Sequence, residues 1–355
     1  MSVRYIGSKA RVAEAILDIA GQPSDGRFVD AFCGTGAVAA VAAARGWSVT
    51  LNDSLPSAVA MSIGATVAMG NVRFESFGGY PRAAKLLNAT PGRPGFIHGA
   101  YSPASATFGA VERRYFTEAN AARIDSMRAQ IKVWSDEGKL TWFEEQLLLA
   151  DLLRAANRVA NISGTYGCFL KNWTRSALRD IQLEARPLME GSTNIEAVVG
   201  DVFDLPTADR DTVYFDPPYT KRQYSAYYHL LETIHAGDAP DIGGITGLRP
   251  WKDKASEFSY KSRALDALTK LALRTPARRI LLSYSNEGHV SQEQLLEALS
   301  EVGGVTLHEI KTIGRYRPNA QASAGGDTVD EFVIEIKPVA LSPLTVTVER
   351  SGVLA

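Results

Sequence analysis

The sequence has few of the features that mark secreted, membrane or metal-binding proteins. Its 355 residues include only two cysteines, which excludes a disulfide framework or a cysteine-based zinc cluster. No apolar run approaches the ~18 residues that a membrane-spanning helix needs, and the first residues contain no apolar segment typical of a secretory signal. We therefore expect a cytoplasmic protein without membrane segments and without a bound metal.

The chain also has almost no excess of charge of either sign. It contains 38 Lys and Arg against 39 Asp and Glu, a net charge of −1. Residues 54–195 carry 16 basic and 12 acidic side chains, whereas the rest of the chain carries 22 and 27. A basic middle beside an acidic remainder is typical of a nucleic-acid-binding face next to a cofactor-binding body. Chance variation explains a difference this small about as well.

Short apolar runs separated by turn signals predict an α/β protein with a Rossmann-like, doubly wound sheet. The predicted strands are, in order, Arg27–Asp30, Trp47–Asn52, Ile195–Val199, Thr212–Phe215, Arg279–Tyr284, Gly304–Lys311 and Glu331–Lys337. Helices are predicted at Ala37–Ala44, a run of small residues, and at Gln292–Leu299. The last two strands alternate in polarity and should close the sheet as an antiparallel pair.

The stretch between the second and third predicted strands lacks the short apolar runs that are typical of strands. Glu118–Trp134 and Trp142–Asn161 carry apolar residues at helical spacing, while Arg82–His98 is rich in Pro and Gly and predicts a loop. We therefore predict a mostly helical insertion. The resulting division is a catalytic body at 1–53 and 196–337, an insertion at 54–195, and an unassigned tail at 338–355.

A glycine turn, Asp30–Gly36 (DAFCGTG), follows the first predicted strand. Its spacing is not the G-x-G-x-x-G fingerprint, because residue 39 is Ala, and no G-K-[ST] motif occurs in the chain. Asp30 would repel phosphates and suits a ligand with a cationic end, such as the amino group of S-adenosylmethionine. Asp53 ends the next strand, where a carboxylate can accept hydrogen bonds from both ribose hydroxyls.

A second motif, Asp216–Tyr219 (DPPY), follows the strand Thr212–Phe215. Two prolines force the chain to turn at the carboxyl edge of the sheet, where open α/β sheets bind their ligands. The carboxylate of Asp216 and the carbonyl of Pro217 can accept hydrogen bonds from an amino group, which makes its nitrogen more nucleophilic. Tyr219 offers a flat face for stacking a base, worth ~1–3 kcal/mol at comparable sites.

Six short motifs in order resemble the DNA adenine methylase family: RYIGSK (Arg4–Lys9), DAFCGTG, LND (Leu51–Asp53), GDVF (Gly200–Phe203), DPPY and LLSYSN (Leu281–Asn286). The resemblance implies direct methyl transfer from S-adenosylmethionine to the N6 amine of adenine. It implies a catalytic role for Asp216, Pro217, Pro218 and Tyr219. It implies a cofactor site formed by Tyr5, Gly7, Ser8, Lys9, Asp30, Phe32, Cys33, Gly34, Thr35, Gly36, Asp53, Asp201 and Val202, with Lys9 near the methionine carboxylate.

The implied partner is double-stranded DNA, from which the target base must be flipped out at a cost of a few kcal/mol. Phosphate contacts must offset that cost. The candidate DNA contacts are Lys221, Arg222, Gln223 and Tyr224 after the tetrad, together with Arg113, Arg114, Lys171 and Arg175 in the insertion. Exposed polar loops explain these side chains about equally well. A separate restriction endonuclease is a possible companion, and an orphan methylase is the alternative.

Other functions remain open from the sequence alone. An RNA-base amino-methyltransferase and an N4-cytosine DNA methyltransferase use similar tetrads, although Ser is typical at the first position for cytosine, so Asp216 favours adenine. Ring-carbon cytosine methylation needs a cysteine after a proline, and neither Cys33 nor Cys168 follows one. A DNA-binding module with a decayed methylase fold is the non-enzymatic alternative, against which the intact motifs argue.

Overall fold

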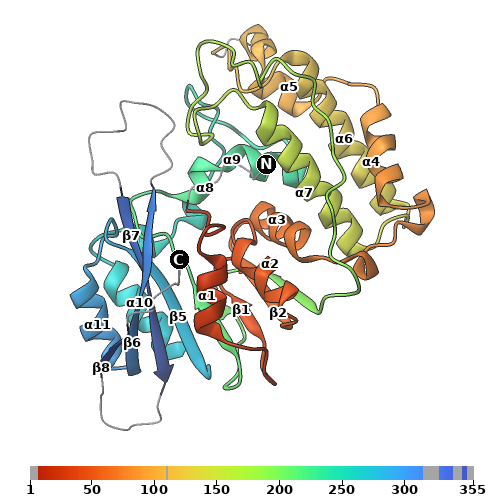
Figure 1. The fold of residues 1–355 in the computed structure, drawn as a ribbon. Helices are drawn as coiled ribbons and strands as arrows, with labels where there is room; N and C mark the ends of the chain where they lie inside the picture. The colour runs from red at the N-terminus through yellow and green to blue at the C-terminus, as the bar shows by residue number, and fades with distance from the viewer. Residues whose placement is uncertain (1–6, 109–110, 315–327, 339–345, 350–355) are drawn as a thin grey trace. The chain divides into compact units, whose positions relative to one another are not determined.

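The computed structural model describes residues 7–108, 111–314, 328–338 and 346–349, which form two compact units (Figure 1). A sheet unit comprises residues 8–54 and 194–223 and the described residues from 255 onwards. A helical unit comprises residues 55–193 and 224–254 together with Gly7. The predicted insertion ends near the same residues as the first long segment of the helical unit. Residues 224–254, however, belong to the helical unit and not to the catalytic body in which the sequence boundaries place them.

The sheet unit is built on one mixed sheet with strand order β3-β2-β1-β4-β5-β7-β6-β8. The strands are β1 (Phe28–Asp30), β2 (Val49–Asp53), β3 (Ile195–Val199), β4 (Thr212–Phe215), β5 (Arg279–Ser285), β6 (Gly303–Gly314), β7 (Thr328–Pro338) and β8 (Val346–Glu349). Neighbours from β3 to β5 are parallel, and β7 runs antiparallel to both β5 and β6. The predicted closing pair is thus confirmed, and β8 adds to β6 a strand that the sequence analysis left unassigned.

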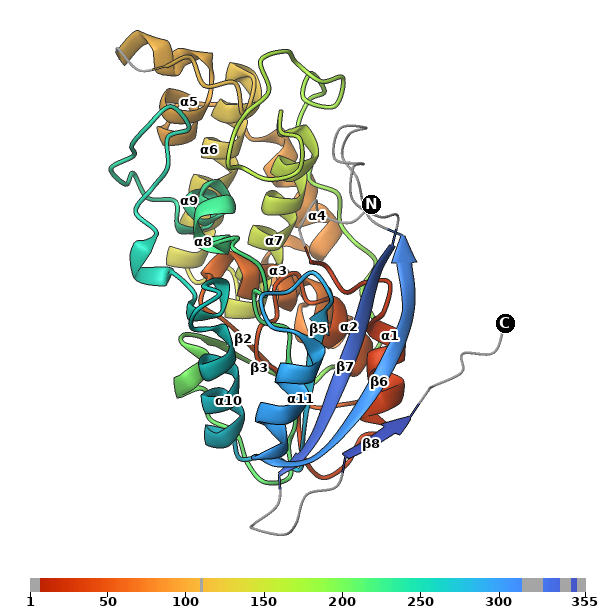
Figure 2. The ribbon, with the colours of Figure 1, turned by 90° about the vertical axis from the view of Figure 1, so that its left-hand side faces the viewer.

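Helices cover both faces of this sheet, which is why its central strands are continuous apolar runs. The chain moves from β1 to β2 in one direction and from β4 to β5 in the other. Right-handed crossovers therefore place the intervening helices on opposite faces. The helices are α1 (Ala13–Ala20) and α2 (Ala37–Ala44) on one face, and α10 (Ala264–Arg274) and α11 (Gln292–Ser300) on the other (Figure 2). The predicted doubly wound α/β class is confirmed.

The topology fixes where a ligand can bind. The strand order reverses between the neighbours β1 and β4, which are parallel. Side chains that follow these strands emerge at the carboxyl edge, the usual binding position in open α/β sheets. The buried core beneath that edge includes Val29, Val213, Ile280 and Leu282.

The helical unit contains the two long helices that the sequence predicts, α6 (Glu118–Asp136) and α7 (Trp142–Val159). Each begins after a threonine whose side chain accepts a backbone hydrogen bond, an N-cap that favours helix initiation. The other helices of this unit are α3 (Pro56–Thr66), α4 (Tyr80–Ala89), α5 (Phe96–Tyr101), α8 (Tyr224–Tyr227) and α9 (His229–Ala236). Short 3₁₀ turns in the two units lie at Met69–Asn71, Glu75–Phe77, Pro103–Phe108, Val202–Asp204, Lys252–Lys254 and Glu257–Ser259.

The predicted loop at Arg82–His98 is wrong at both ends. Helix α4 extends to Ala89 and α5 begins at Phe96, so only the residues between them are irregular. Pro81 lies in the first turn of α4, where proline removes no helical hydrogen bond, and the Ala and Leu residues after it favour helix. The proline therefore marks the start of a helix rather than a loop.

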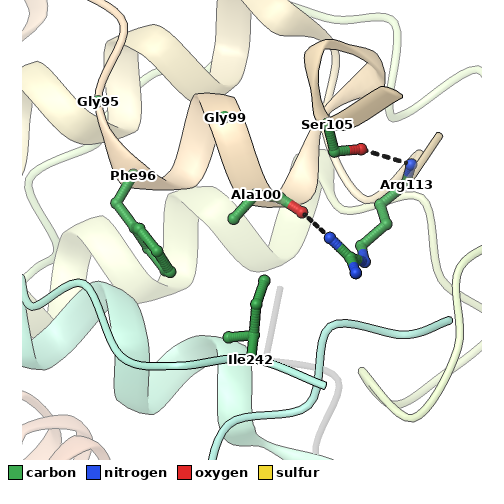
Figure 3. Close-up of a pocket in the computed structure, with 7 residues that line it drawn as sticks. All are labelled: Gly95, Phe96, Gly99, Ala100, Ser105, Arg113 and Ile242. Carbon is green, nitrogen blue, oxygen red and sulfur yellow. Dashed lines mark hydrogen bonds between the residues drawn. The ribbon is translucent and has the colours of Figure 1, made fainter. Parts of the chain in front are cut away.

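A buried arginine holds the 237–254 segment to the rest of the helical unit. Arg113 is 6% exposed, and its guanidinium donates to the carbonyl oxygens of Ala100, Gly244 and Ile245 at 3.0–3.2 Å. Arg113 also lines a pocket together with Gly95, Phe96, Gly99, Ala100, Ser105 and Ile242 (Figure 3). Because its donors are used within the protein, Arg113 is a structural residue and not the DNA contact that the sequence suggests.

Candidate active site

The glycine turn connects β1 to α2 through backbone conformations that glycine adopts readily. Gly34 has φ 49° and Gly36, the N-cap of α2, has φ 76°. Residues other than glycine rarely adopt this left-handed backbone conformation. The Gly36 N–H donates to the Cys33 carbonyl at 2.7 Å, which closes the turn tightly. The backbone can therefore approach a ligand closely just beyond the carboxyl end of β1.

Residues at the end of β2 fix this turn. The Gly34 N–H donates to Asp53 Oδ2 at 3.1 Å, and Asn52 Nδ2 donates to the Ala31 carbonyl at 3.0 Å. The Cys33 N–H donates to the Asn52 carbonyl at 2.8 Å. The predicted ribose acid Asp53 thus also positions the glycine turn. Phe32 and Thr35 of the same turn are partly buried.

Asp30 lies at the end of β1 with 2% of its surface exposed, and its Oδ1 is buried without a hydrogen-bond partner. Burial raises the pKa of this carboxyl well above its usual value, and the negative charges of Asp216 and Asp53 raise the pKa further. A buried carboxylate oxygen without a donor is unfavourable in the protein alone. It fits a ligand that brings a cationic donor to the turn.

The tetrad Asp216–Tyr219 follows β4, the strand beside β1. Its last residue is held from two directions: the His289 N–H donates to the Tyr219 carbonyl at 2.9 Å, and the Tyr219 ring packs against Tyr284 of β5 with centroids 5.2 Å apart. Tyr284 belongs to the LLSYSN segment, so that motif supports the aromatic face of the tetrad. The backbone and the ring of Tyr219 are therefore held in place at the carboxyl edge of the sheet.

Lys9 reaches the tetrad, whereas the family resemblance places it near the methionine carboxylate. Its Nζ lies 2.9 Å from Asp216 Oδ1, 3.4 Å from the Tyr219 hydroxyl, and 5.1 Å from the centroid of the Tyr219 ring. The side chain is buried, which disfavours its charge. The nearby Asp216, Tyr219 and Glu331 outweigh that effect and raise the pKa of Lys9 well above its usual value. An ammonium group thus occupies the position at which Asp216 would receive an amine.

The remaining predicted cofactor residues lie at different places. Asp201 is exposed after β3 and accepts from the Phe203 N–H at 3.0 Å, while Val202 is partly buried against the core. Ser8 is exposed in the sheet unit, Gly7 belongs to the helical unit, and Tyr5 lies outside the described residues.

The predicted DNA contacts divide between exposed and buried side chains. Lys221 and Arg222 are exposed in the sheet unit. Gln223 is 8% exposed, and its amide pairs with the backbone of Ser256 in both directions, at 2.8 and 3.2 Å. We therefore assign Gln223 a structural role in place of a DNA contact.

In the helical unit, Lys171 and Arg175 are exposed and Tyr224 begins α8. Arg114 donates to the Lys171 carbonyl at 2.7 Å, so the backbone of this loop is anchored while the Lys171 side chain is exposed.

Two residues near the tetrad are absent from the sequence-based site. Glu331 Oε1 lies 3.8 Å from Lys9 Nζ, and His289 positions Tyr219. Glu331 is the first residue of the alternating segment EFVIEIK. Because β7 runs antiparallel, its beginning lies at the edge where the parallel strands end. A carboxylate at that position was the signal that could have identified it.

Together, these residues place a hydrogen-bond acceptor for an amine beside an aromatic face, next to a glycine turn and two further acids. No cluster of His, Cys, Asp and Glu able to hold a metal occurs among the residues that the structure describes. Likewise, none of the described helices is long and apolar enough to cross a membrane.

Comparisons with known proteins agree with this geometry. A family model described as D12 class N6 adenine-specific DNA methyltransferase matches residues 5–295. The modification methylase StsI of Streptococcus sanguinis is 32% identical over 95% of the chain and 52% of its own length. The type II methyltransferase M.FokI of Planomicrobium okeanokoites is 30% identical over 96% and 53%. The type II methyltransferase M.NlaIII of Neisseria lactamica is 33% identical over 86% and 90%. The chain spans about half the length of the first two relatives.

Proposed function

Because the chain belongs to the D12 class of N6 adenine-specific DNA methyltransferases, we propose that it methylates the N6 amine of adenine in duplex DNA, with S-adenosylmethionine as the methyl donor. The observation that carries the proposal is the placement of Asp216 and Tyr219 beside the glycine turn, at the point where the strand order reverses. A donor at the turn and a base at the tetrad would then be neighbours.

The residues around the glycine turn fit S-adenosylmethionine. The partnerless Asp30 Oδ1 would accept from the amino group of the methionine part, and the turn at Gly34 and Gly36 would let the backbone approach it. Asp53 would accept hydrogen bonds from the ribose, and Asp201 and Val202 would border the adenine ring. When bound, the cofactor would supply an electrophilic methyl group on a sulfonium.

The tetrad would position and activate the target amine. Asp216 Oδ1 and the Pro217 carbonyl would accept its two N–H groups and draw its lone pair out of conjugation with the ring. Tyr219 would stack on the flipped base with its own ring supported by Tyr284. We expect most of the rate enhancement to come from orientation and from acceptors that are fixed before the substrate arrives.

We assign DNA recognition to the helical unit and to the exposed residues after the tetrad. Lys171 and Arg175 would contact phosphates from the helical unit, and Lys221 and Arg222 would do so at the mouth of the base pocket. The relatives named as modification methylases or type II methyltransferases support a role in protecting DNA beside a restriction endonuclease.

A transfer experiment tests the proposal. The protein is incubated with S-adenosylmethionine labelled in the methyl group and with unmethylated genomic DNA, and the nucleosides are separated. Label in N6-methyl-2′-deoxyadenosine, absent when the Asp216→Ala variant is used, is the expected result. Label in N4-methyl-2′-deoxycytidine, or in ribosomal RNA offered in a parallel reaction, would support one of the alternatives instead. Cofactor binding without transfer to any nucleic acid would support a binding module.

A further inference from the structure

Lys9, which pairs with Asp216 of the tetrad, also lies near a second carboxylate, that of Glu331. Glu331 is in β7 and pairs with Ser285 at the carboxyl end of β5, while Asp216 directly follows β4. Both carboxylates therefore leave the sheet at the same edge. Lys9 Nζ lies 2.9 Å from Asp216 Oδ1 and 3.8 Å from Glu331 Oε1.

The hydrogen-bonding capacity of the Glu331 carboxylate is largely unused in the structure. Its Oε2 is buried without a hydrogen-bond partner, and its Oε1 is beyond hydrogen-bond distance of the lysine. Burial raises the pKa of Glu331, the charge of Lys9 opposes that rise, and the charge of Asp216 adds to it. A buried carboxylate in this situation is stabilised substantially if the ammonium group of Lys9 moves toward it.

Such a movement would favour the proposed reaction. The Lys9 ammonium competes with the adenine amine for Asp216 Oδ1 and lies over the Tyr219 ring on which the base would stack. An ammonium group displaced into a buried site without another anion would be strongly destabilised. Glu331 offers that anion within about 1 Å of a hydrogen bond, given the usual N–O separation of 2.7–2.9 Å for such pairs.

We propose that Glu331 is a positioning residue, which takes the Lys9 ammonium from Asp216 when the target base binds and so clears the acceptor for the amine. This role rests on the proposed function. One cation pairs first with Asp216 and then with Glu331, so the net charge of the site is the same in both states. No bond is made or broken in this step.

The test is a double-mutant cycle of Glu331→Gln and Lys9→Met, measured as kcat and KM for DNA, with calorimetric S-adenosylmethionine binding and a melting curve for each variant. Glu331→Gln should lower kcat/KM for DNA about tenfold, the size expected for one charge-assisted hydrogen bond, and leave cofactor binding unchanged. In the Lys9→Met background it should have no further effect, because there is no ammonium left to move.

Two further variants separate this role from a structural one. Glu331→Asp keeps the charge and should recover most of the rate. Glu335→Gln removes another buried carboxylate of β7, one that pairs with His308 at 3.0 Å and with Arg279 at 3.6 Å. It should lower the melting temperature without lowering kcat/KM for DNA. If Lys9→Met is inactive, the comparison of Glu331→Asp with Glu331→Gln decides whether Glu331 has a positioning or a structural role.

Three results would overturn the role. They are wild-type kinetics for Glu331→Gln, an undiminished effect of that substitution beside Lys9→Met, and equal losses for the Asp and Gln variants. Each of these leaves methyl transfer by the unsubstituted protein intact. An unsubstituted protein that binds the cofactor but methylates no DNA would overturn the proposed function, and the role of Glu331 with it.

Discussion

Each unit buries charge, and the two units do so differently. In the helical unit, Asp151 of α7 is 1% exposed, and both of its oxygens have donors. Arg186 donates to Oδ1 from Nε at 2.9 Å, Arg154 donates to the same oxygen at 3.2 Å, and the Tyr80 hydroxyl donates to Oδ2. In the sheet unit, Asp30 is equally buried, but its Oδ1 has no partner.

This difference in hydrogen bonding distinguishes buried charges that stabilise the fold from buried charges that are available to bind a ligand. A fully paired buried carboxylate contributes to a rigid structure, and its removal leaves the groups that paired with it buried without a partner. A buried carboxylate with an unused oxygen is unfavourable until a donor arrives. Asp30 and Glu331 both have such oxygens, and both lie at the carboxyl edge beside Asp216. Among the residues that the structure describes, the buried carboxylate oxygens without a partner therefore locate the site independently of the motifs.

The largest effect is expected from the structural cluster. Asp151→Asn removes the charge that pairs with Arg154 and Arg186, and it should lower the free energy of unfolding by about 3–5 kcal/mol. Urea titration followed by circular dichroism measures the loss. Methyl transfer per folded molecule should stay unchanged. A loss of transfer without a loss of stability would contradict the structural assignment.

The next effect concerns chemistry rather than stability. Asp216→Ala removes an acceptor from the target amine, and we expect transfer to fall by about 10²–10³-fold or more. Calorimetric binding of S-adenosylmethionine and the melting temperature should change little. If cofactor affinity falls as far as the transfer rate, the division between the tetrad and the glycine turn is incorrect.

A smaller effect is expected at the end of β2. Asp53→Ala removes the proposed ribose acceptor and the partner of the Gly34 N–H. Cofactor affinity should fall about ten- to hundredfold, as for the loss of a hydrogen bond to a charged group. The exposed Asp209→Ala is a matched control and should leave the dissociation constant unchanged. An unaltered constant for Asp53→Ala would remove this residue from the cofactor site.

The smallest effect is expected on the helical unit's surface. Arg175→Ala should weaken DNA binding and reduce the slope of log K against log salt by about 1, the loss of one phosphate contact. Arg175→Lys keeps the charge and should retain the slope. Arg210→Ala, in which the lost arginine pairs with Asp25, serves as the control in the sheet unit. Equal slopes for the Ala variant and the unsubstituted protein would place the contact elsewhere.

The sheet and the tetrad could be predicted from the sequence because buried parallel strands are apolar runs and because Gly and Pro mark the turns after them. The attachment of residues 224–254 to the helical unit could not. It depends on contacts between residues far apart in the chain, such as Arg113 donating to the carbonyls of Gly244 and Ile245 and Arg128 donating to the carbonyl of His235. Backbone acceptors leave no trace in the sequence. The pairing of Lys9 with Asp216 joins residues far apart in the chain, so no local pattern indicated it.

The most direct test of the account compares Asp30→Asn with Asp151→Asn in unfolding free energy and in S-adenosylmethionine binding. Burial raises the pKa of Asp30. Its contribution to stability is therefore present below the pKa of the unfolded chain, about 3.9, and is lost as the pH rises through the folded pKa.

At about pH 8, Asp30→Asn should therefore make the protein more stable and weaken cofactor binding, while Asp151→Asn should destabilise it and leave binding unchanged. The stability gain should shrink as the pH falls toward about 4. An Asp30→Asn protein that is destabilised at every pH, with unaltered affinity for S-adenosylmethionine, would contradict the account.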